Sequence, residues 1–133
     1  MGDKRLVSLN SFRLVAILGV IGIGASCSPK IDRSAVLGRY IANHGRGLDV
    51  LELYSGGTYI HTYRPNGGNE IRDGGNWKFY EENGTPRVTF GGFLPSLGNH
   101  IRGNWDVEVG RSWRGELRFC IDSDLNYYYI RQK

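Results

Sequence analysis

Residues 48–64 read LDVLELYSGGTYIHTYR, and this stretch decides the fold class. Apolar and polar side chains alternate in its first and last parts, which is the period-two pattern of a half-buried β-strand. The Ser-Gly-Gly triplet at 55–57 is a hairpin signal, because glycine reaches positive φ without a Cβ clash. In the last part, the alternation places Tyr59, His61 and Tyr63 on one face.

The same pattern continues on both sides of this stretch. No segment after residue 36 shows a sustained helical period with caps. We expect strands at 38–41, 48–54, 58–64, 76–80, 87–90, 104–109, 116–121 and 126–131, with a short piece at 70–72 that leads through a turn at 73–75 into the fourth strand. Short connections favour antiparallel pairing of sequential neighbours. The prediction is an all-β fold, a small antiparallel meander barrel of about eight strands.

The first 26 residues have the layout of a cleavable secretory signal. Residues 1–13 are polar and basic, residues 14–25 are apolar without interruption, and Ser26 is a small residue before Cys27. The apolar run is too short for a membrane-spanning helix, which needs about 20 residues. We therefore expect residues 1–26 to be removed from the mature protein.

The end of this segment, Gly24-Ala25-Ser26-Cys27, resembles the bacterial lipobox. The resemblance implies a lipoprotein signal peptide, cleavage before Cys27 and lipid attachment to its thiol. Ser28, rather than Asp, after the cysteine resembles a signal for transfer to the outer membrane. The implied location is the bacterial cell envelope, lipid-anchored in the outer membrane and facing the periplasm. The alternative is an ordinary signal peptide that happens to precede a cysteine.

The mature chain divides into a tether and a domain. Residues 28–36, SPKIDRSAV, are mostly polar and contain a proline, so residues 27–36 are expected to be a lipidated tether. Residues 37–133 then form the β-barrel domain. Cys120 is left as a lone thiol, which we expect to be a small, half-buried side chain.

The net charge of +4 does not indicate a nucleic-acid-binding protein. Residues 1–26 carry three basic side chains and one acidic one, so half of the excess leaves with the signal. In the remainder, 14 basic and 12 acidic side chains are interleaved without a basic run. Such a mild excess is typical of a solvated surface rather than of a phosphate-binding footprint.

Three motifs of turn glycines and aromatic or aliphatic residues carry a further resemblance. They are Gly38-x-Tyr40, Leu51-x-Leu53-x(3)-Gly57-x-Tyr59 and Gly75-x-Trp77-x-Phe79. Together they look like small bacterial lipoproteins with a lipocalin-like barrel and no assigned function, over about half of the folded part. Motifs of this kind specify a fold rather than an activity.

The sequence predicts neither an enzyme nor a metal or cofactor site. His44, His61 and His100 lie in different segments, and none has a metal-type partner at i+2 or i+4. Asp122 and Asp124 fit an ordinary turn better than a calcium loop, because no glycine and no bidentate glutamate follow. No Gly-x-Ser-x-Gly nucleophile elbow is present. A close cluster of His61 with a carboxylate in a cleft would favour an enzyme instead.

Two functions remain. The first is a non-catalytic, lipid-anchored binding module that holds a small apolar or glycan ligand near Tyr59, His61, Tyr63 and Trp77. The alternative is a structural or interaction lipoprotein whose barrel is filled and whose aromatic last strand, Tyr127-Tyr128-Tyr129, contacts an envelope partner. An interior packed solid by Trp77, Phe79, Phe90, Trp105 and Phe119 would count against a ligand inside the barrel.

Overall fold

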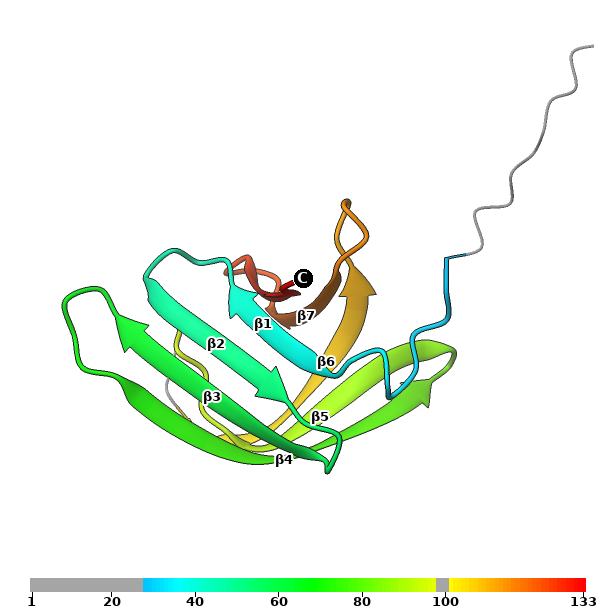
Figure 1. Cartoon of the computed structure of the whole chain (residues 1–133), viewed down its shortest axis with the longest axis horizontal. Helices are drawn as coiled ribbons and strands as arrows, with labels where there is room; N and C mark the ends of the chain where they lie inside the picture. Colours follow the sequence, from blue (N-terminus) through cyan, green and yellow to red (C-terminus); the bar gives the residue numbers. More distant parts are fainter. Residues whose placement is uncertain (1–27, 98–100) are drawn as a thin grey trace, which may run out of the picture.

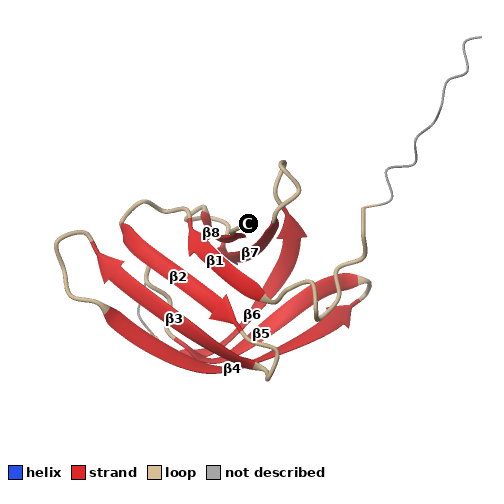
Figure 2. Ribbon diagram, viewed as in Figure 1, coloured by secondary structure: helices blue, strands red, loops and turns tan. Residues whose placement is uncertain are grey.

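The computed structural model describes residues 28–97 and 101–133, so the predicted signal, Cys27 and His100 lie outside the described residues. The strands are β1 (Gly38–Ala42), β2 (Gly47–Leu53), β3 (Thr58–Pro65), β4 (Ile71–Glu82), β5 (Thr85–Phe93), β6 (Gly103–Arg111), β7 (Leu117–Asp122) and β8 (Tyr127–Arg131). Each strand pairs antiparallel with the next, and β8 pairs with β1, which closes the barrel (Figures 1 and 2). This confirms the predicted fold class. In the part of the chain described, no helix is long and apolar enough to cross a membrane.

The predicted turn at 73–75 is wrong, because these residues lie inside the long strand β4. Gly74 pairs with Ile60 and Gly75 with Tyr59 across the β3–β4 ladder. A Cβ atom on Gly75 would lie 2.2 Å from the carbonyl oxygen of Gly91, and one on Gly74 would lie 2.6 Å from that of Tyr59. The glycines therefore allow a close backbone approach rather than a chain reversal.

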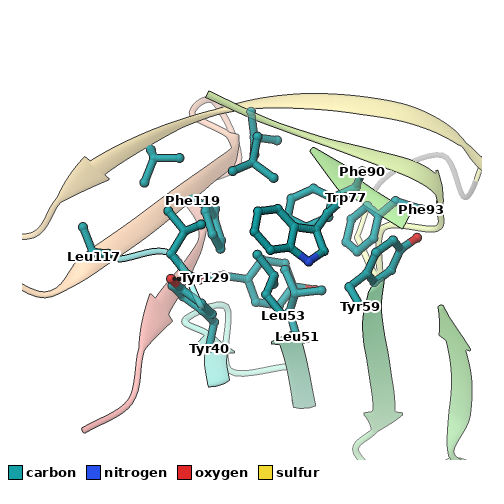
Figure 3. Packing of buried hydrophobic residues seen from close by; sticks show 14 of the residues in the cluster. Tyr40, Leu51, Leu53, Tyr59, Trp77, Phe90, Phe93, Leu117, Phe119 and Tyr129 are labelled. Carbon is teal, nitrogen blue, oxygen red and sulfur yellow. Dashed lines mark hydrogen bonds between the residues drawn. The ribbon is translucent and has the colours of Figure 1, made fainter. Parts of the chain in front are cut away.

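The middle of the barrel is filled by side chains that point inward from all eight strands (Figure 3). Aromatic rings dominate it: the ring centroids of Tyr40 and Phe119 are 4.4 Å apart, and those of Tyr59 and Phe90 are 5.3 Å apart. Of the aromatic residues expected inside, Trp77, Phe90 and Phe119 are buried, and Phe79 and Trp105 pack against them while half-buried.

The barrel has two ends that differ in how they are closed. The N-terminal end is formed by residues 28–37, the β2–β3, β4–β5 and β6–β7 turns and residues 132–133. The polar end is formed by the β1–β2, β3–β4 and β7–β8 turns together with residues 94–97. The antiparallel order places these two sets on opposite sides (Figure 1).

The folded part begins before residue 37, where the sequence places its start. Val36 has no exposed surface, and Ile31 and Ala35 pack against the same core. Tyr40 Oη donates to the carbonyl of Val36 at 2.8 Å, and Arg131 Nη1 donates to that of Ala35 at 2.7 Å. Residues 31–36 thus form an apolar plug over the N-terminal end, and the segment expected to be a tether contributes to the core.

Candidate functional site

The buried polar side chains of the described residues gather at the polar end. Asp49 on β2 is 0% exposed, His61 on β3 is 3% exposed and Ser96 after β5 is 5% exposed. Strand alternation turns Asp49 and His61 inward, and residues 94–97 fold over them. With their partners they form the polar cluster, which consists of His44, Asp49, His61, Asp73, Ser96, Tyr127 and Tyr129.

Asp49 accepts hydrogen bonds on both carboxylate oxygens. His61 Nε2 lies 2.9 Å from Oδ1, and Tyr129 Oη donates to Oδ1 at 2.5 Å. His44 Nε2 lies 2.8 Å from Oδ2, and Tyr127 Oη donates to Oδ2 at 3.0 Å. The carboxylate therefore draws together β2, β3, β8 and the β1–β2 turn.

The same carboxylate also accepts a hydrogen bond from the Ser96 hydroxyl. Burial by itself raises the pKa of Asp49, but the hydrogen bonds from His61, Ser96, Tyr129 and His44 outweigh burial and hold the pKa at about 2. Asp49 is therefore a buried anion at neutral pH, with its charge spread over five donors.

The surroundings of His44 and of the two tyrosines determine which of their atoms carry hydrogens. The backbone N–H of Arg46 donates to His44 Nδ1 at 3.0 Å, so the hydrogen of a neutral His44 ring sits on Nε2 and faces Asp49. Burial raises the pKa of the Tyr129 hydroxyl well above its ordinary value, and Tyr127 and Asp49 add to the effect. Burial and the charge of Asp49 likewise raise the pKa of Tyr127, so both phenols stay protonated donors.

His61 is held between two carboxylates. Its Nε2 faces Asp49, and its Nδ1 lies 2.9 Å from Oδ1 of Asp73 on β4. This is the close His–carboxylate cluster that the sequence analysis names as favouring an enzyme. Both ring nitrogens already face protein oxygens, however, so neither has a lone pair free to take a proton from a substrate. The arrangement supports His61 as a structural bridge rather than as a general base.

Asp73 has one oxygen that the cluster does not use. Its side chain is 8% exposed, and Oδ2 makes no hydrogen bond to any residue that the structure describes. Arg102 Nη1, which carries two hydrogens, lies 3.2 Å from Oδ2 as an ion pair and donates a hydrogen bond to the carbonyl of Gly92 at 2.7 Å. Among the described residues, the half-exposed Arg102 is therefore the partner of Oδ2, and this oxygen keeps a lone pair for a further donor.

Asp73 lies in the wall of a pocket of about 270 Å³ at the polar end. The pocket is lined by His61, Tyr63, Ile71, Asp73, Leu94, Pro95 and Ser96. Its polar groups come from the cluster, whereas Tyr63, Ile71 and Leu94 supply apolar walls. A concave, mostly apolar site with a few convergent polar groups is the usual form of a small-molecule site.

The structure separates the four residues predicted to face a ligand. His61 and Tyr63 line the pocket at the polar end. Tyr59 and Trp77 lie in the core, where Tyr59 Oη donates to the carbonyl of Gly91 and Trp77 Nε1 to that of Tyr54, both at 3.0 Å. Burial, assisted by the charge of Asp73, raises the pKa of Tyr59 to about 12.

Sequence reasoning missed Asp49, Asp73 and Ser96 as site residues. One signal was available for Asp49, which shares an inward face with Leu51 and Leu53 and is the only charged residue on that face of β2. No local pattern distinguishes Asp73 beside two glycines, or Ser96 in an irregular segment. Their roles depend on pairing with β3 and on the path of the chain after β5.

The remaining candidate residues have ordinary surroundings. Asp122 Oδ1 accepts the backbone N–H groups of Asp124 at 2.9 Å and Leu125 at 3.1 Å, which is the geometry of a side-chain-capped turn. Cys120 is a free, half-buried thiol. Within residues 28–97 and 101–133, no group of three or more His, Cys, Asp or Glu side chains is placed to hold a metal ion.

Comparison with known proteins adds no relative. No family model matches the chain, no curated protein matches it, and no solved structure matches it. The resemblances to a lipobox and to lipocalin-like lipoproteins therefore stay predictions from the sequence, and the function is argued from the site alone.

Proposed function

We propose that the protein is a lipid-anchored, non-catalytic binding module of the bacterial cell envelope, which takes a small ligand at the polar end of its barrel. The observation that carries the proposal is Oδ2 of Asp73, which lies in the wall of an apolar pocket and has only the Arg102 ion pair, and no hydrogen bond, among the described residues. A ligand that brings an N–H or O–H group to this oxygen would add a hydrogen bond that none of the described residues makes.

The shape of the site limits the ligand. Because aromatic side chains fill the middle of the barrel, the ligand sits in the pocket at the rim and not along the barrel axis. A volume of about 270 Å³ suits one sugar ring or a compact apolar alcohol rather than a long acyl chain. The ring of Tyr63 and the side chain of Ile71 would pack on its apolar face, with a hydroxyl group directed at Asp73.

The ligand hypothesis is tested by titrating the isotope-labelled chain from Ser28 onward with three probes. These are methyl β-D-glucopyranoside, methyl N-acetyl-β-D-glucosaminide and cyclohexylmethanol, followed by amide chemical shifts. We expect at least one probe to shift residues 71–73 and 96 selectively. Asp73→Asn keeps the shape but removes the charge, and should weaken binding about tenfold or more. Asp124→Asn in the exposed β7–β8 turn is the matched control and should change nothing.

Two outcomes would contradict the ligand hypothesis. One is that none of the probes shifts the pocket amides. The other is that Asp73→Asn binds as tightly as the unaltered chain, which would show that the Asp73 carboxylate does not anchor the ligand.

The anchor is tested separately on the full chain. Cys27→Ser should abolish incorporation of labelled fatty acid and move the protein from the outer-membrane fraction to the soluble periplasmic fraction. A Cys27→Ser chain that stays membrane-bound and acylated would refute lipid attachment at this residue.

The alternative function, a structural lipoprotein that contacts an envelope partner, has one observation in its favour, which is the filled interior. Strand β8, which this alternative assigns to the partner contact, exposes less aromatic surface than the sequence suggests. Tyr127 and Tyr129 are buried, and the outward Tyr128 is covered by the guanidinium of Arg118 at 4.8 Å from the ring centre. A photo-crosslinker at position 128 that captures one envelope protein in cells, while a crosslinker at exposed position 72 captures none, would favour this alternative.

A further inference from the structure

The N-terminal end of the barrel carries an exposed tryptophan. Trp113 lies in the β6–β7 turn and is 87% exposed, whereas Trp77 is buried and Trp105 half-buried. The guanidinium of Arg114 lies 4.6 Å from the centre of its ring. An exposed indole beside a cation is suited to the interface between lipid and water, where the ring is apolar and the cation meets headgroups.

A basic groove of about 420 Å³ lies next to this tryptophan. Four cationic side chains line it, together with one acidic side chain, Glu116: they are Arg111, Arg114, Arg131 and Lys133. In the described part of the chain, none of the four makes an ion pair with an acidic side chain. Arg111 donates to the carbonyls of Gly115 and Pro29, and Arg131 to that of Ala35. Carbonyls do not neutralise a guanidinium, so the groove keeps a positive field.

The described chain that follows the predicted lipid attachment site contacts the same groove. Arg111 Nη2 donates to the carbonyl of Pro29 at 3.1 Å, which fixes Pro29 at this end of the barrel. Cys27 is two residues earlier in the sequence. Because residues 31–36 pack on the barrel, only a few residues separate the barrel from an acyl chain on Cys27.

We propose that the N-terminal end is a docking surface for anionic phospholipid, with headgroup phosphates in the groove of Arg111, Arg114, Arg131 and Lys133 and Trp113 at the interface. The groove and the tryptophan bind phospholipid whether or not Cys27 is acylated. Only permanent attachment to the membrane depends on the lipid anchor in the proposed function. Docking at this end directs the polar end, and its pocket, away from the membrane.

The test uses the chain from Ser28 onward, which contains every core residue of the barrel and lacks Cys27. Its binding is measured by co-sedimentation with vesicles of phosphatidylcholine alone and of phosphatidylcholine with 30% phosphatidylglycerol. Protection of tryptophan fluorescence from acrylamide is the second readout. We expect binding only to the anionic vesicles, protection of Trp113 on binding, and loss of both at high salt, which screens surface charge.

Two variants are compared with matched controls at the other end and on the outer face. Arg114→Gln with Lys133→Gln should weaken vesicle binding about fivefold for each charge removed. Trp113→Ser should weaken it and abolish the change in fluorescence. The controls are Arg64→Gln with Arg72→Gln for charge and Leu125→Ser for an exposed apolar residue, and neither should affect binding.

Equal binding to neutral and anionic vesicles, or no binding to either, would overturn the docking proposal. Equal losses in the test and control variants would also overturn it, because binding would then not be local to this end. Circular dichroism of each variant confirms that the barrel is intact. Since this chain lacks Cys27, failure here is distinguishable from failure of the anchor, which the full-chain Cys27→Ser experiment measures.

Discussion

The two ends of the barrel are closed by opposite means. At the N-terminal end, residues 31–36 fold back as an apolar plug, with Val36 fully buried in the core. At the polar end, residues 94–97 close over Asp49, a buried carboxylate that five side chains contact. Apolar packing is tolerant of small changes in shape, whereas a buried charge requires nearly all its donors in place. The plug therefore stabilises the fold, and the polar cluster makes one end of it geometrically specific.

The largest expected effect is at Asp49. Asp49→Ala removes the acceptor shared by His44, His61, Ser96, Tyr127 and Tyr129 and leaves buried donors without partners. We expect the free energy of unfolding to fall by about 3–5 kcal/mol, measured by urea denaturation. Asp124→Ala in the exposed turn is the control. If Asp49→Ala does not fold, Asp49→Asn keeps the shape and should still cost more than the control; a loss no larger than that of Asp124→Ala would show that the cluster is not a stabilising unit.

The apolar plug should show the next largest effect. Val36→Ala removes two buried methyl groups and should lower the free energy of unfolding by about 2 kcal/mol. Leu125→Ala, at a half-exposed position of the polar end, should change it much less. If the chain up to residue 36 were a free tether, Val36→Ala would not change the free energy of unfolding. This measurement therefore decides whether residues 31–36 belong to the folded domain.

Acid should weaken the polar end selectively. The folded pKa of Asp49 is about 2, below its ordinary value of 3.8, so its contribution is complete above pH 4 and is lost as the pH falls toward 2. The loss amounts to about 2 kcal/mol, visible as a falling urea midpoint between pH 4 and pH 2. In the Asp49→Asn chain, the urea midpoint should not show this fall between pH 4 and pH 2. Identical slopes in the two chains would assign the acid sensitivity to other carboxylates.

The smallest effect is expected on the exposed side of the plug. Arg33 donates to the carbonyl of Ser55 at 3.2 Å, and its guanidinium lies 5.1 Å from the centre of the Trp77 ring. Because Arg33 is exposed, Arg33→Ala should cost only about 0.5–1 kcal/mol. Arg39→Ala on the outer face of β1 is the control. A cost comparable to that of Val36→Ala would mean that the plug is held by its cation as much as by its apolar residues.

Local sequence patterns predicted most of the strands. They failed where one residue type occurs in two different structural settings. Alternation predicted the inward face of β7 and placed Tyr59, His61 and Tyr63 together on one face of β3, but it did not decide which tyrosines of β8 point inward. Gly74 and Gly75 were read as a turn, yet they lie where β4 passes close to β3 and β5. A glycine pair has the same local signature in both settings, because the difference is the position of another strand.

The candidate site was predictable only in part, for the same reason. His61 and Tyr63 follow from alternation on one strand, and both line the pocket. Asp73 reaches His61 only because the two residues are paired across the β3–β4 ladder, and Ser96 reaches Asp49 from 47 residues away. Neither distance along the chain nor residue type indicates such a contact before register and loop path are known.

The sequence by itself determined the all-β class, a count of about eight strands, most of the inward faces and the prediction of a lipidated Cys27. Each follows from period two, from turn residues or from a short linear motif, all of which act between near neighbours. Only the tertiary structure decided that residues 31–36 plug one end, that Asp49 organises the other, and that Trp113 lies beside a basic groove. These are contacts between segments far apart in the chain, and closure of the barrel is what brings them together.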